Sequence, residues 1–248
     1  MMSALDLERA LDAAGLEAPV RFEEVTGSTN DTAFQLAQSG LPEWTLVAAG
    51  HQTAGRGRMG RAWSDRAGRA LMFSIVLRPT FDPDLGGLIP LLAGSAMAGA
   101  IGEVAGIEVR CKWPNDLLIG DEKVGGILVE SSIERARIRH AVLGVGVNLE
   151  PPSDVASATG IGDVDAPRLL GTFVRRFHDG YARLPGDVVE TWSAVSGTLG
   201  RDVRADRVEG IALRGKAVAV DGRGALVIET RDGRVAITSG EIDHLGGD

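Results

Sequence analysis

A loop rich in glycine and arginine, Gly50 to Trp63, is the feature of this chain that most restricts its fold. It contains four glycines and three arginines. It lies between two apolar runs, 45–49 and 70–77, which have the composition of buried strands. Glycines let backbone N–H groups approach a ligand closely, and arginine side chains match the oxygens of phosphates and carboxylates. The loop therefore predicts an anion-binding site held at both ends by core strands.

Residues 55–60 of this loop also fit the G-x-G-x-x-G pattern of dinucleotide-binding proteins. That pattern requires a helix directly after the glycines and an acidic residue at the end of the next strand. Here residues 61–66 have no helical apolar period, and the next strand ends in Arg78-Pro79. A dinucleotide site is therefore disfavoured.

Two further interpretations of the loop concern its arginines. They could grip a nucleic-acid backbone, but the chain carries 26 Lys and Arg against 34 Asp and Glu. The resulting net charge of −8 disfavours a polyanion as the main partner. They could also belong to a solvated surface loop with no role, which is common for such loops. The loop alone leaves this last alternative open.

Composition places the chain among ordinary globular proteins. Its 248 residues fit one large domain with a small second one, and 44% hydrophobic residues suffice for a core. The single cysteine, Cys111, excludes an internal disulfide and fits a reducing compartment. Residues 1–8 lack the basic and apolar regions of a secretory signal. We therefore expect a cytoplasmic protein.

The uncharged segment 85–102 raises the question of a membrane span. It contains Pro90 and five glycines. A spanning helix needs about 20 strongly apolar residues, which this segment does not supply. We therefore expect a closely packed core helix and no membrane partner.

Apolar periodicity divides the chain into a large mixed part and a small β part. Helical patterns and strand patterns are interspersed in the first part. Besides the segment 85–102, helical patterns cover 3–14, the stretch from about 31 to Gly40, 165–184 and 186–195. From Gly200, short β runs alternate with turn signals such as Asp232-Gly233, a spacing typical of a small SH3-like barrel. We expect one domain over residues 1–198 and a second over residues 199–248.

Two shorter features each allow a structural and a functional interpretation. Residues 26–31 place hydroxyl and amide side chains ahead of a helical period, which is typical of a helix N-cap and also of a polar ligand site. Lys112 and Lys123 lie in otherwise apolar strands, where a lysine is costly to bury unless it meets an anion. Both lysines could instead extend outward from edge strands.

Five motifs in a fixed order resemble those of the biotin–protein ligases. They are G-S-T-N (27–30), Q-T-A-G-R-G-R-x-G-R-x-W (52–63), K-W-P-N-D (112–116), K-x-G-G-I-L-V-E (123–130) and G-V-G-V-N (144–148). The resemblance covers most of residues 20–150, and the β tail is similar to that family's C-terminal domain. It implies an α+β fold: a mixed β-sheet with helices on one side, related to class II aminoacyl-tRNA synthetases, plus a small C-terminal SH3-like β-barrel.

The resemblance also implies roles for individual residues. The residues that would bind biotin are Ser28, Thr29, Gln52, Gly55, Arg56, Lys123 and Gly126. The residues that would bind ATP are Arg58, Arg61, Trp63, Lys112, Asn115 and Asn148, with Trp63 over the adenine. The catalytic cations would be Lys123, Arg58 and Lys112, and no metal ligand of the chain is implied.

The implied activity is adenylation of biotin by ATP, with Mg²⁺ on the leaving pyrophosphate, followed by transfer of biotin to a lysine of a biotin carboxyl carrier domain. Joining a carboxylate to a phosphate brings two anions together, so fixed cations suit this chemistry independently of the resemblance. A loop that orders over the product would protect the mixed anhydride from water. The general base for the transfer step is not visible, and Asp116 is a weak candidate.

Other activities compete with this interpretation. A lipoate or octanoate ligase shares the fold and the adenylation chemistry, but the polar set Ser28, Thr29 and Gln52 suits a ureido ring better than an alkyl chain. A protein that only senses biotin would not need transition-state cations. The sequence lacks the G-x-S-x-G and H-E-x-x-H motifs of hydrolases. Because 27 residues precede Ser28, we expect no N-terminal DNA-binding domain and no DNA partner; the oligomeric state stays open.

Overall fold

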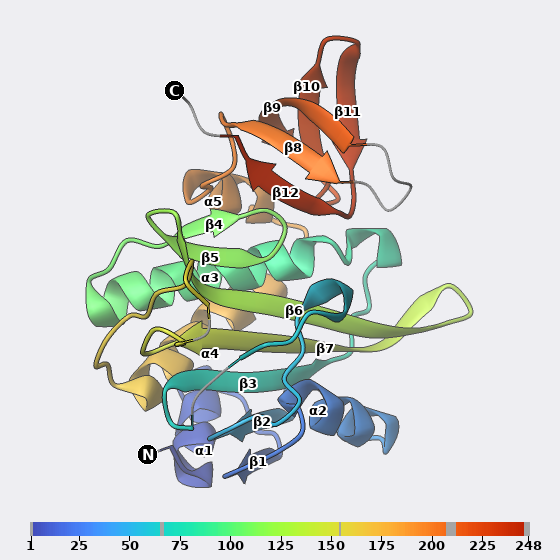
Figure 1. Ribbon diagram of the computed structural model, residues 1–248. Helices are drawn as coiled ribbons and strands as arrows, with labels where there is room; N and C mark the ends of the chain where they lie inside the picture. Colours follow the sequence, from blue (N-terminus) through green and yellow to red (C-terminus); the bar gives the residue numbers. More distant parts are fainter. Residues whose placement is uncertain (1, 65–66, 154, 207–211, 246–248) are drawn as a thin grey trace.

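The computed structural model describes residues 2–64, 67–153, 155–206 and 212–245, whose strands form two sheets (Figure 1). Within these ranges the larger sheet has seven strands in the order β1-β2-β3-β7-β6-β5-β4. Neighbouring strands are antiparallel except for the parallel pair β1 and β2. The strands span Val20–Glu23 (β1), Leu46–Ala49 (β2), Ala70–Leu77 (β3), Arg110–Lys112 (β4), Asp116–Ile119 (β5), Glu122–Glu134 (β6) and Arg137–Asn148 (β7).

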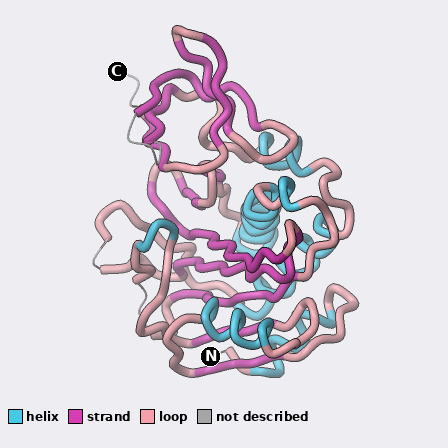
Figure 2. Tube along the Cα trace, turned by 90° about the vertical axis from the view of Figure 1, so that its right-hand side faces the viewer, coloured by secondary structure: helices cyan, strands magenta, loops and turns pink. Residues whose placement is uncertain are grey.

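One face of the larger sheet packs against a layer of helices, which can be followed in Figure 2. Alternate strand residues such as Leu46, Ala48 and Leu143 enter this core, because successive side chains of a strand point to opposite faces. The helices of the layer are α1 (Ala4–Asp12), α3 (Leu88–Ala105), α4 (Ala166–Tyr181) and α5 (Val188–Ala194).

Helix α2 (Thr29–Gln38) packs on the opposite face of the same sheet. Its Ala33 and Ala37 contact a small cluster formed by Val47, Val76 and Val142, the strand residues that alternate with the main core. The mixed sheet with a helical side is thus confirmed, and α2 adds a helix on the second side. This placement brings the first turn of α2 to the face over which the arginine-rich loop runs.

Helix α3 is the uncharged segment that raised the question of a membrane. The stretch Pro83–Ala105 is long and apolar enough to cross a membrane by length and composition alone, and it includes the short 3₁₀ helix η2 (Pro83–Leu85). However, 67% of its most apolar window is buried inside the protein. The helix ends at Gly106, whose φ of 69° is a left-handed conformation that glycine adopts readily. As expected, α3 is a core helix.

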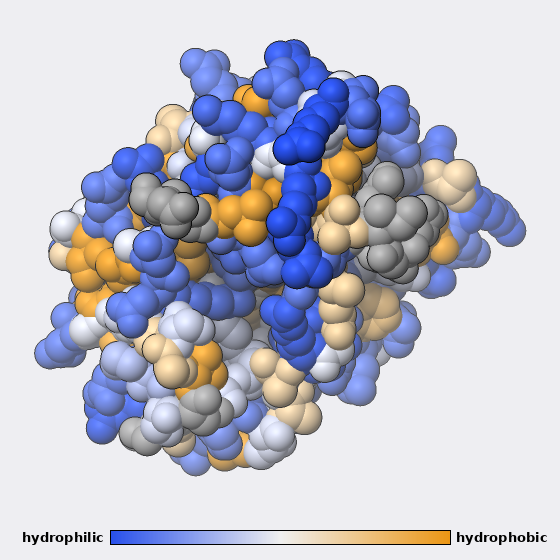
Figure 3. Space-filling view, turned by 45° about the horizontal axis from the view of Figure 1, so that its top comes forward, coloured by the Kyte–Doolittle hydropathy of each residue, from blue (hydrophilic) through white to orange (hydrophobic). Residues whose placement is uncertain are grey.

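The second sheet is antiparallel and lies beyond the β4 edge of the first (Figure 1). Its order is β11-β10-β9-β8-β12, with strands Asp202–Asp206 (β8), Ala212–Val220 (β9), Leu226–Thr230 (β10), Gly233–Ile237 (β11) and Glu241–His244 (β12). The β10–β11 hairpin confirms the predicted turn with a shift of one residue, because Arg231 and Asp232 form the loop and Gly233 pairs with Thr230. Strand β12 was not predicted, and the expected first residue of β9, Ile211, lies outside the described residues. Seen from this end, the surface is mostly hydrophilic with separate apolar patches (Figure 3).

Trp113 joins the two sheets. Its backbone N–H donates to Thr198 Oγ1 at 3.0 Å, and its indole N–H donates to the carbonyl oxygen of Gly224 at 3.0 Å. The backbones of Gly87 and Gly224 also meet here, because a Cβ atom added to Gly87 would lie 2.6 Å from the carbonyl oxygen of Arg223. The small sheet is therefore seated directly on the loop between β4 and β5 and on the start of α3.

We expect Gly87→Ala to loosen this seat. Gly87 has φ −63°, so alanine fits the backbone, and the cost comes from the clash with Arg223. Unfolding in urea should show a loss of about 1–3 kcal/mol, the usual cost of overpacking.

The matched control is Gly102→Ala in the same helix, where the added Cβ would lie 3.8 Å from its nearest neighbour. This variant should gain up to about 1 kcal/mol, because alanine favours the helix. Equal stability of Gly87→Ala and the wild type would contradict the close seating of the small sheet.

Candidate active site

A cavity of about 180 Å³ opens where the loop Gly50–Trp63 crosses the larger sheet. The start of α2, the loop, strands β4 to β7 and the turn before β12 all contribute to it. Within the loop, Arg58–Gly60 form the 3₁₀ turn η1. The residues predicted from the sequence that line the cavity are Ser28, Thr29, Gln52, Arg56, Arg58, Arg61, Trp63, Lys112, Asn115, Lys123 and Gly126.

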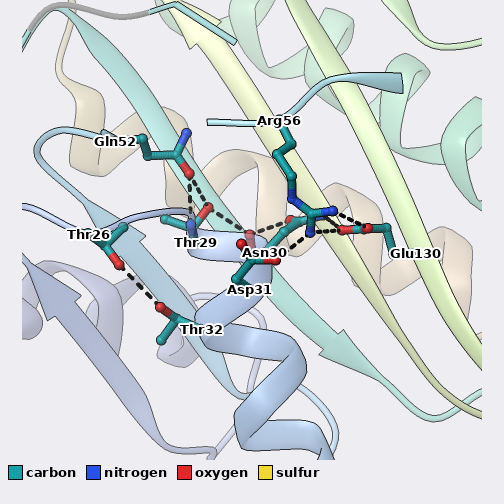
Figure 4. A network of polar contacts seen from close by, with 9 residues as sticks. Thr26, Thr29, Asn30, Asp31, Thr32, Gln52, Arg56 and Glu130 are labelled. Carbon is teal, nitrogen blue, oxygen red and sulfur yellow. Dashed lines mark hydrogen bonds and ion pairs between the residues drawn. The ribbon is translucent and has the colours of Figure 1, made fainter. Parts of the chain in front are cut away.

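Polar side chains at the start of α2 form one end of the cavity (Figure 4). Gln52 Oε1 accepts hydrogen bonds from the backbone N–H of Thr29 at 2.7 Å and from its hydroxyl at 3.1 Å. Ser28 occupies the N-cap position of α2, but its hydroxyl makes no capping hydrogen bond. The backbone of this segment therefore starts the helix as an N-cap does. Its side chains do not cap the helix, and that of Thr29 bonds to Gln52 instead. This end of the cavity offers hydroxyl and amide groups to a neutral polar ligand.

Four basic side chains gather at the other end of the cavity. Lys123 Nζ lies 2.6 Å from Asp116 Oδ1, and Asp116 is also the register partner of Lys112 across β4 and β5. Arg61 forms an ion pair with Glu241 of β12. Asp116 pairs with Lys123 and lies beside Lys112 in the sheet, so basic side chains outnumber carboxylates at this end, which suits an anion.

Arg58 is the most enclosed of the loop arginines. Its Nη1 donates to Asn115 Oδ1 at 3.3 Å and to the carbonyl oxygen of Gly240 at 3.4 Å. Burial lowers the pKa of Arg58, while the charges of Asp116 and Glu241 oppose that change. A guanidinium keeps its charge in proteins, so Arg58 brings a poorly solvated positive charge to the cavity.

Trp63 lies against two glycines of the sheet. A Cβ atom added to Gly146 would lie 2.6 Å from Trp63 Cζ2, and one added to Gly126 would lie 3.6 Å from Trp63 Cζ3. The indole nitrogen is buried and has no hydrogen-bond partner among the described residues. The glycines of the fourth and fifth motifs therefore make room for the ring, which walls the cavity.

Arg56 points differently from its neighbours in the loop. Its guanidinium forms ion pairs with Asp31 of α2 at 2.5 Å and with Glu130 of β6 at 2.8 Å (Figure 4). Although Arg56 lines the cavity, its charge is thereby matched by carboxylates of the chain. This geometry supports a role in fixing the loop more than a role in binding a ligand anion.

Two of the predicted residues lie outside the lining of the cavity. Gly55 packs against the backbone of Trp63, which lines the cavity, since an added Cβ would lie 2.8 Å from the carbonyl oxygen of Trp63. Asn148 is buried and donates to the carbonyl oxygen of Thr159 at 3.1 Å, so it holds the following loop. Their contribution to a ligand site remains a prediction.

Several lining residues were not predicted as site residues from the sequence. Asn30 lay within the first motif and could have been found there. Gly240, Glu241 and Asp243 belong to a short segment without a recognisable pattern, so the sequence offers no signal for them.

The described side chains of the cavity do not form a metal site by themselves. The described residues contain no group of three or more His, Cys, Asp or Glu side chains that could hold a metal ion. Among the carboxylates of the cavity, Asp116 and Glu241 already pair with Lys123 and Arg61. A cation here would need oxygens from a bound substrate, which is how Mg²⁺ commonly binds with nucleotide phosphates.

The fold and the cavity define a class of protein that holds a small anionic molecule between a sheet and a cationic loop. The chain belongs to the Biotin/lipoate A/B protein ligase family, whose model matches residues 22–148. The Biotin protein ligase C terminal domain matches residues 198–245. The resemblance found from the five motifs is therefore confirmed.

Individual proteins support this membership. The chain is 34% identical over 237 residues to the bifunctional ligase/repressor BirA of Bacillus subtilis, covering 90% of this chain and 73% of that protein. It is 33% identical over 236 residues to the biotin–[acetyl-CoA-carboxylase] ligase of Paracoccus denitrificans, covering 88% and 97%. A solved structure of the biotin protein ligase from Aquifex aeolicus in complex with biotin and ATP matches with a TM-score of 0.76 at 24% identity, covering 91% and 97%. This last likeness concerns the fold.

We expect His244 of β12, which lies near the positive charges of Lys112 and Arg201, to make the stability of the protein depend on pH. Burial, Lys112 and Arg201 lower its pKa from 6.5 to about 4. Between these values the unfolded chain binds more protons than the folded one, so the free energy of unfolding should fall as the pH drops from 6.5 to 4.

His244→Gln should flatten this dependence by roughly 1 kcal/mol, a value that allows for solvent screening of a half-buried group. Urea unfolding of both proteins at neutral and mildly acidic pH measures the difference. Identical pH slopes for the two proteins would show that His244 is not responsible.

Proposed function

We propose that this protein adenylates biotin with ATP, releases pyrophosphate, and transfers the biotinyl group to a lysine of a biotin carboxyl carrier domain. The observation that carries the proposal is the division of one cavity into a neutral polar end, with Thr29 and Gln52, and a cationic end, with Lys112, Lys123 and Arg58. The two ends match the ureido ring and the carboxylate of biotin. The names of the Paracoccus and Aquifex relatives support the same substrate.

In the first step, an oxygen of the biotin carboxylate attacks the α-phosphorus of ATP, and the bond to the leaving pyrophosphate breaks. Negative charge concentrates around the phosphorus as the new bond forms. Fixed cations stabilise this transition state more than the separated substrates, which raises the rate of the chemical step. Lys123, Lys112 and Arg58 are proposed for this role, with Mg²⁺ bound to the nucleotide as part of the substrate.

In the second step, the amine of the acceptor lysine attacks the acyl carbon and AMP leaves. The attacking amine must lose a proton, and Asp116 was a weak candidate for the base. Its 2.6 Å contact with Lys123 instead supports a role in holding that ammonium in place. The loop over the cavity would keep water from the mixed anhydride until the acceptor arrives.

The remaining assignments follow from this division. Ser28, Gly55 and Gly126 are proposed beside biotin, and Arg61, Trp63, Asn115 and Asn148 beside the nucleotide. Residues 1–198 would form the catalytic domain, and residues 199–248 would add the turn that closes the nucleotide end. A buried thiol at Cys111, whose pKa burial raises to about 12, is consistent with a cytoplasmic enzyme.

A lipoate or octanoate ligase is the second candidate, since the matching family includes lipoate ligases. Carboxylate-dependent exchange of labelled pyrophosphate into ATP, run separately with biotin, lipoate and octanoate, distinguishes them. Exchange with biotin alone would support the proposal, and exchange with lipoate or octanoate alone would replace it. Biotin binding without exchange would indicate a sensor.

We expect Lys123→Gln to reduce biotin-dependent exchange by at least about 100-fold, the usual effect of removing a group that stabilises transition-state charge. Glutamine keeps most of the length of the side chain and removes its charge. Lys216→Gln is the matched control, because Lys216 is exposed on β9, away from the cavity. Equal exchange in Lys123→Gln and the wild type, with unchanged melting temperatures, would remove Lys123 from the mechanism.

A further inference from the structure

We propose that Glu130 is a positioning residue that links the two sides of the biotin pocket. Through Arg56 it holds the loop Gly50–Trp63, and through Asn30 it orients the hydroxyl groups at the start of α2. This inference rests on the proposed function and deepens it, because it assigns the residue that fixes the geometry of the ureido end.

The contact with the loop is a two-point ion pair. Glu130 Oε1 and Oε2 accept hydrogen bonds from Arg56 Nη1 and Nη2 at 2.9 Å and 2.8 Å (Figure 4). Asp31 Oδ1 accepts a third hydrogen bond from the same guanidinium, at 2.5 Å from Nη2. Paired hydrogen bonds of this kind are both directional and strong for their class. Arg56 is thereby fixed to β6 and α2 at once, and the loop is fixed with it.

The same carboxylate also contacts Asn30, at the start of α2, and so links the loop to the pocket. Glu130 Oε2 also accepts from Asn30 Nδ2 at 2.9 Å. A carboxylate only accepts hydrogen bonds, so it sets which end of the Asn30 amide faces it. The amide oxygen is then turned inward, where Ser74 Oγ donates to it at 2.7 Å. The charge of Glu130 therefore determines the direction of each hydrogen bond that follows.

The fixed direction of these hydrogen bonds extends to the Thr29 hydroxyl, which is proposed to contact biotin. Ser74 has one hydroxyl proton. When Asn30 takes it, the Thr29 hydroxyl, 2.8 Å from Ser74 Oγ, keeps its own proton for Gln52 Oε1 at 3.1 Å. The lone pairs of the Thr29 hydroxyl then remain for a ligand. A ureido ring offers N–H donors that need such acceptors. A pocket ordered in this way favours biotin over an alkyl chain, which offers none.

Burial makes this network sensitive to loss of Glu130. Asn30 is 4% exposed and Ser74 is fully buried. Gly144 leaves the space for Asn30, since a Cβ atom there would lie 2.0 Å from Asn30 Oδ1. A buried polar network is favourable only while all its members are satisfied. An ordinary surface ion pair contributes little, but here the same carboxylate also satisfies a buried amide.

The first test is Glu130→Gln, which keeps the shape of the side chain and removes its charge. We expect the half-life of enzyme-bound biotinyl-adenylate to shorten by roughly tenfold, because charge-assisted hydrogen bonds to both Arg56 and Asn30 are weakened. Glu134→Gln is the matched control. Glu134 lies on the same strand and pairs with Arg139 at 3.4 Å, outside the cavity, so its loss should leave the half-life unchanged.

A second measurement needs no substrate. Trypsin cuts after arginine, and the loop contains Arg56, Arg58 and Arg61. Glu130→Gln should be cut in the loop several times faster than the wild type or Glu134→Gln, with all three proteins compared well below their melting temperatures. Arg56→Gln, which leaves the Asn30 contact intact, should also speed cleavage after Arg58 and Arg61. In the double variant, cleavage after Arg58 and Arg61 should be no faster than in Arg56→Gln alone, because Arg56→Gln already removes the ion pairs with both Glu130 and Asp31.

Wild-type cleavage and wild-type adenylate half-life in Glu130→Gln would overturn the inference. Additive effects of Glu130→Gln and Arg56→Gln would also overturn it, since the two would then act separately. If Glu130→Gln does not fold, normal loop cleavage in Arg56→Gln would count against it. Failure of the wild type to form any adenylate would instead overturn the proposed function, and the cleavage results would still decide whether Glu130 holds the loop.

Discussion

The concentration of positive charge around one cavity is the constraint on which the rest of this structure depends. Positive charges repel each other, and carboxylates placed beside them reduce that repulsion. Lys123 forms an ion pair with Asp116, and Arg61 forms one with Glu241. Arg56 forms ion pairs with both Asp31 and Glu130. These carboxylates come from β5, β12, α2 and β6, so elements far apart in the sequence supply neighbours to the site.

The backbone is adapted to the same requirement. Gly146 and Gly126 lie under Trp63, and Gly144 leaves room for Asn30. A side chain at Gly144 or Gly146 would have to displace the neighbour that shapes the cavity. The glycines of the strand motifs therefore leave space for the side chains that form the cavity. The glycines of the loop instead allow its backbone to turn. One type of residue thus serves two different physical purposes within a short distance.

The sequence was informative where chemistry and local pattern coincide. Residue type and position marked the loop, Lys112, Lys123 and the start of α2 as candidates, the resemblance assigned their roles, and the cavity brings them together. Glu241 could not be predicted, because its role depends on where a distant small sheet is seated, and no local pattern records that. The pairing of Arg56 was missed for a related reason. An arginine in a motif shows that it has a partner, but not whether that partner is a ligand or a carboxylate of the chain.

The turn before β12 has a consequence for how the site is assembled during synthesis. The residues that line the cavity begin at Ser28 and end at Asp243, so the wall is complete only when nearly all of the described chain has been made. The loop and the strands of the larger sheet leave the ribosome long before Glu241, which closes the cationic end. An emerging chain can therefore fold its core around a cavity that is still open on one side. Completion of the small sheet is then a late step, and the cationic end of the cavity is closed only after it.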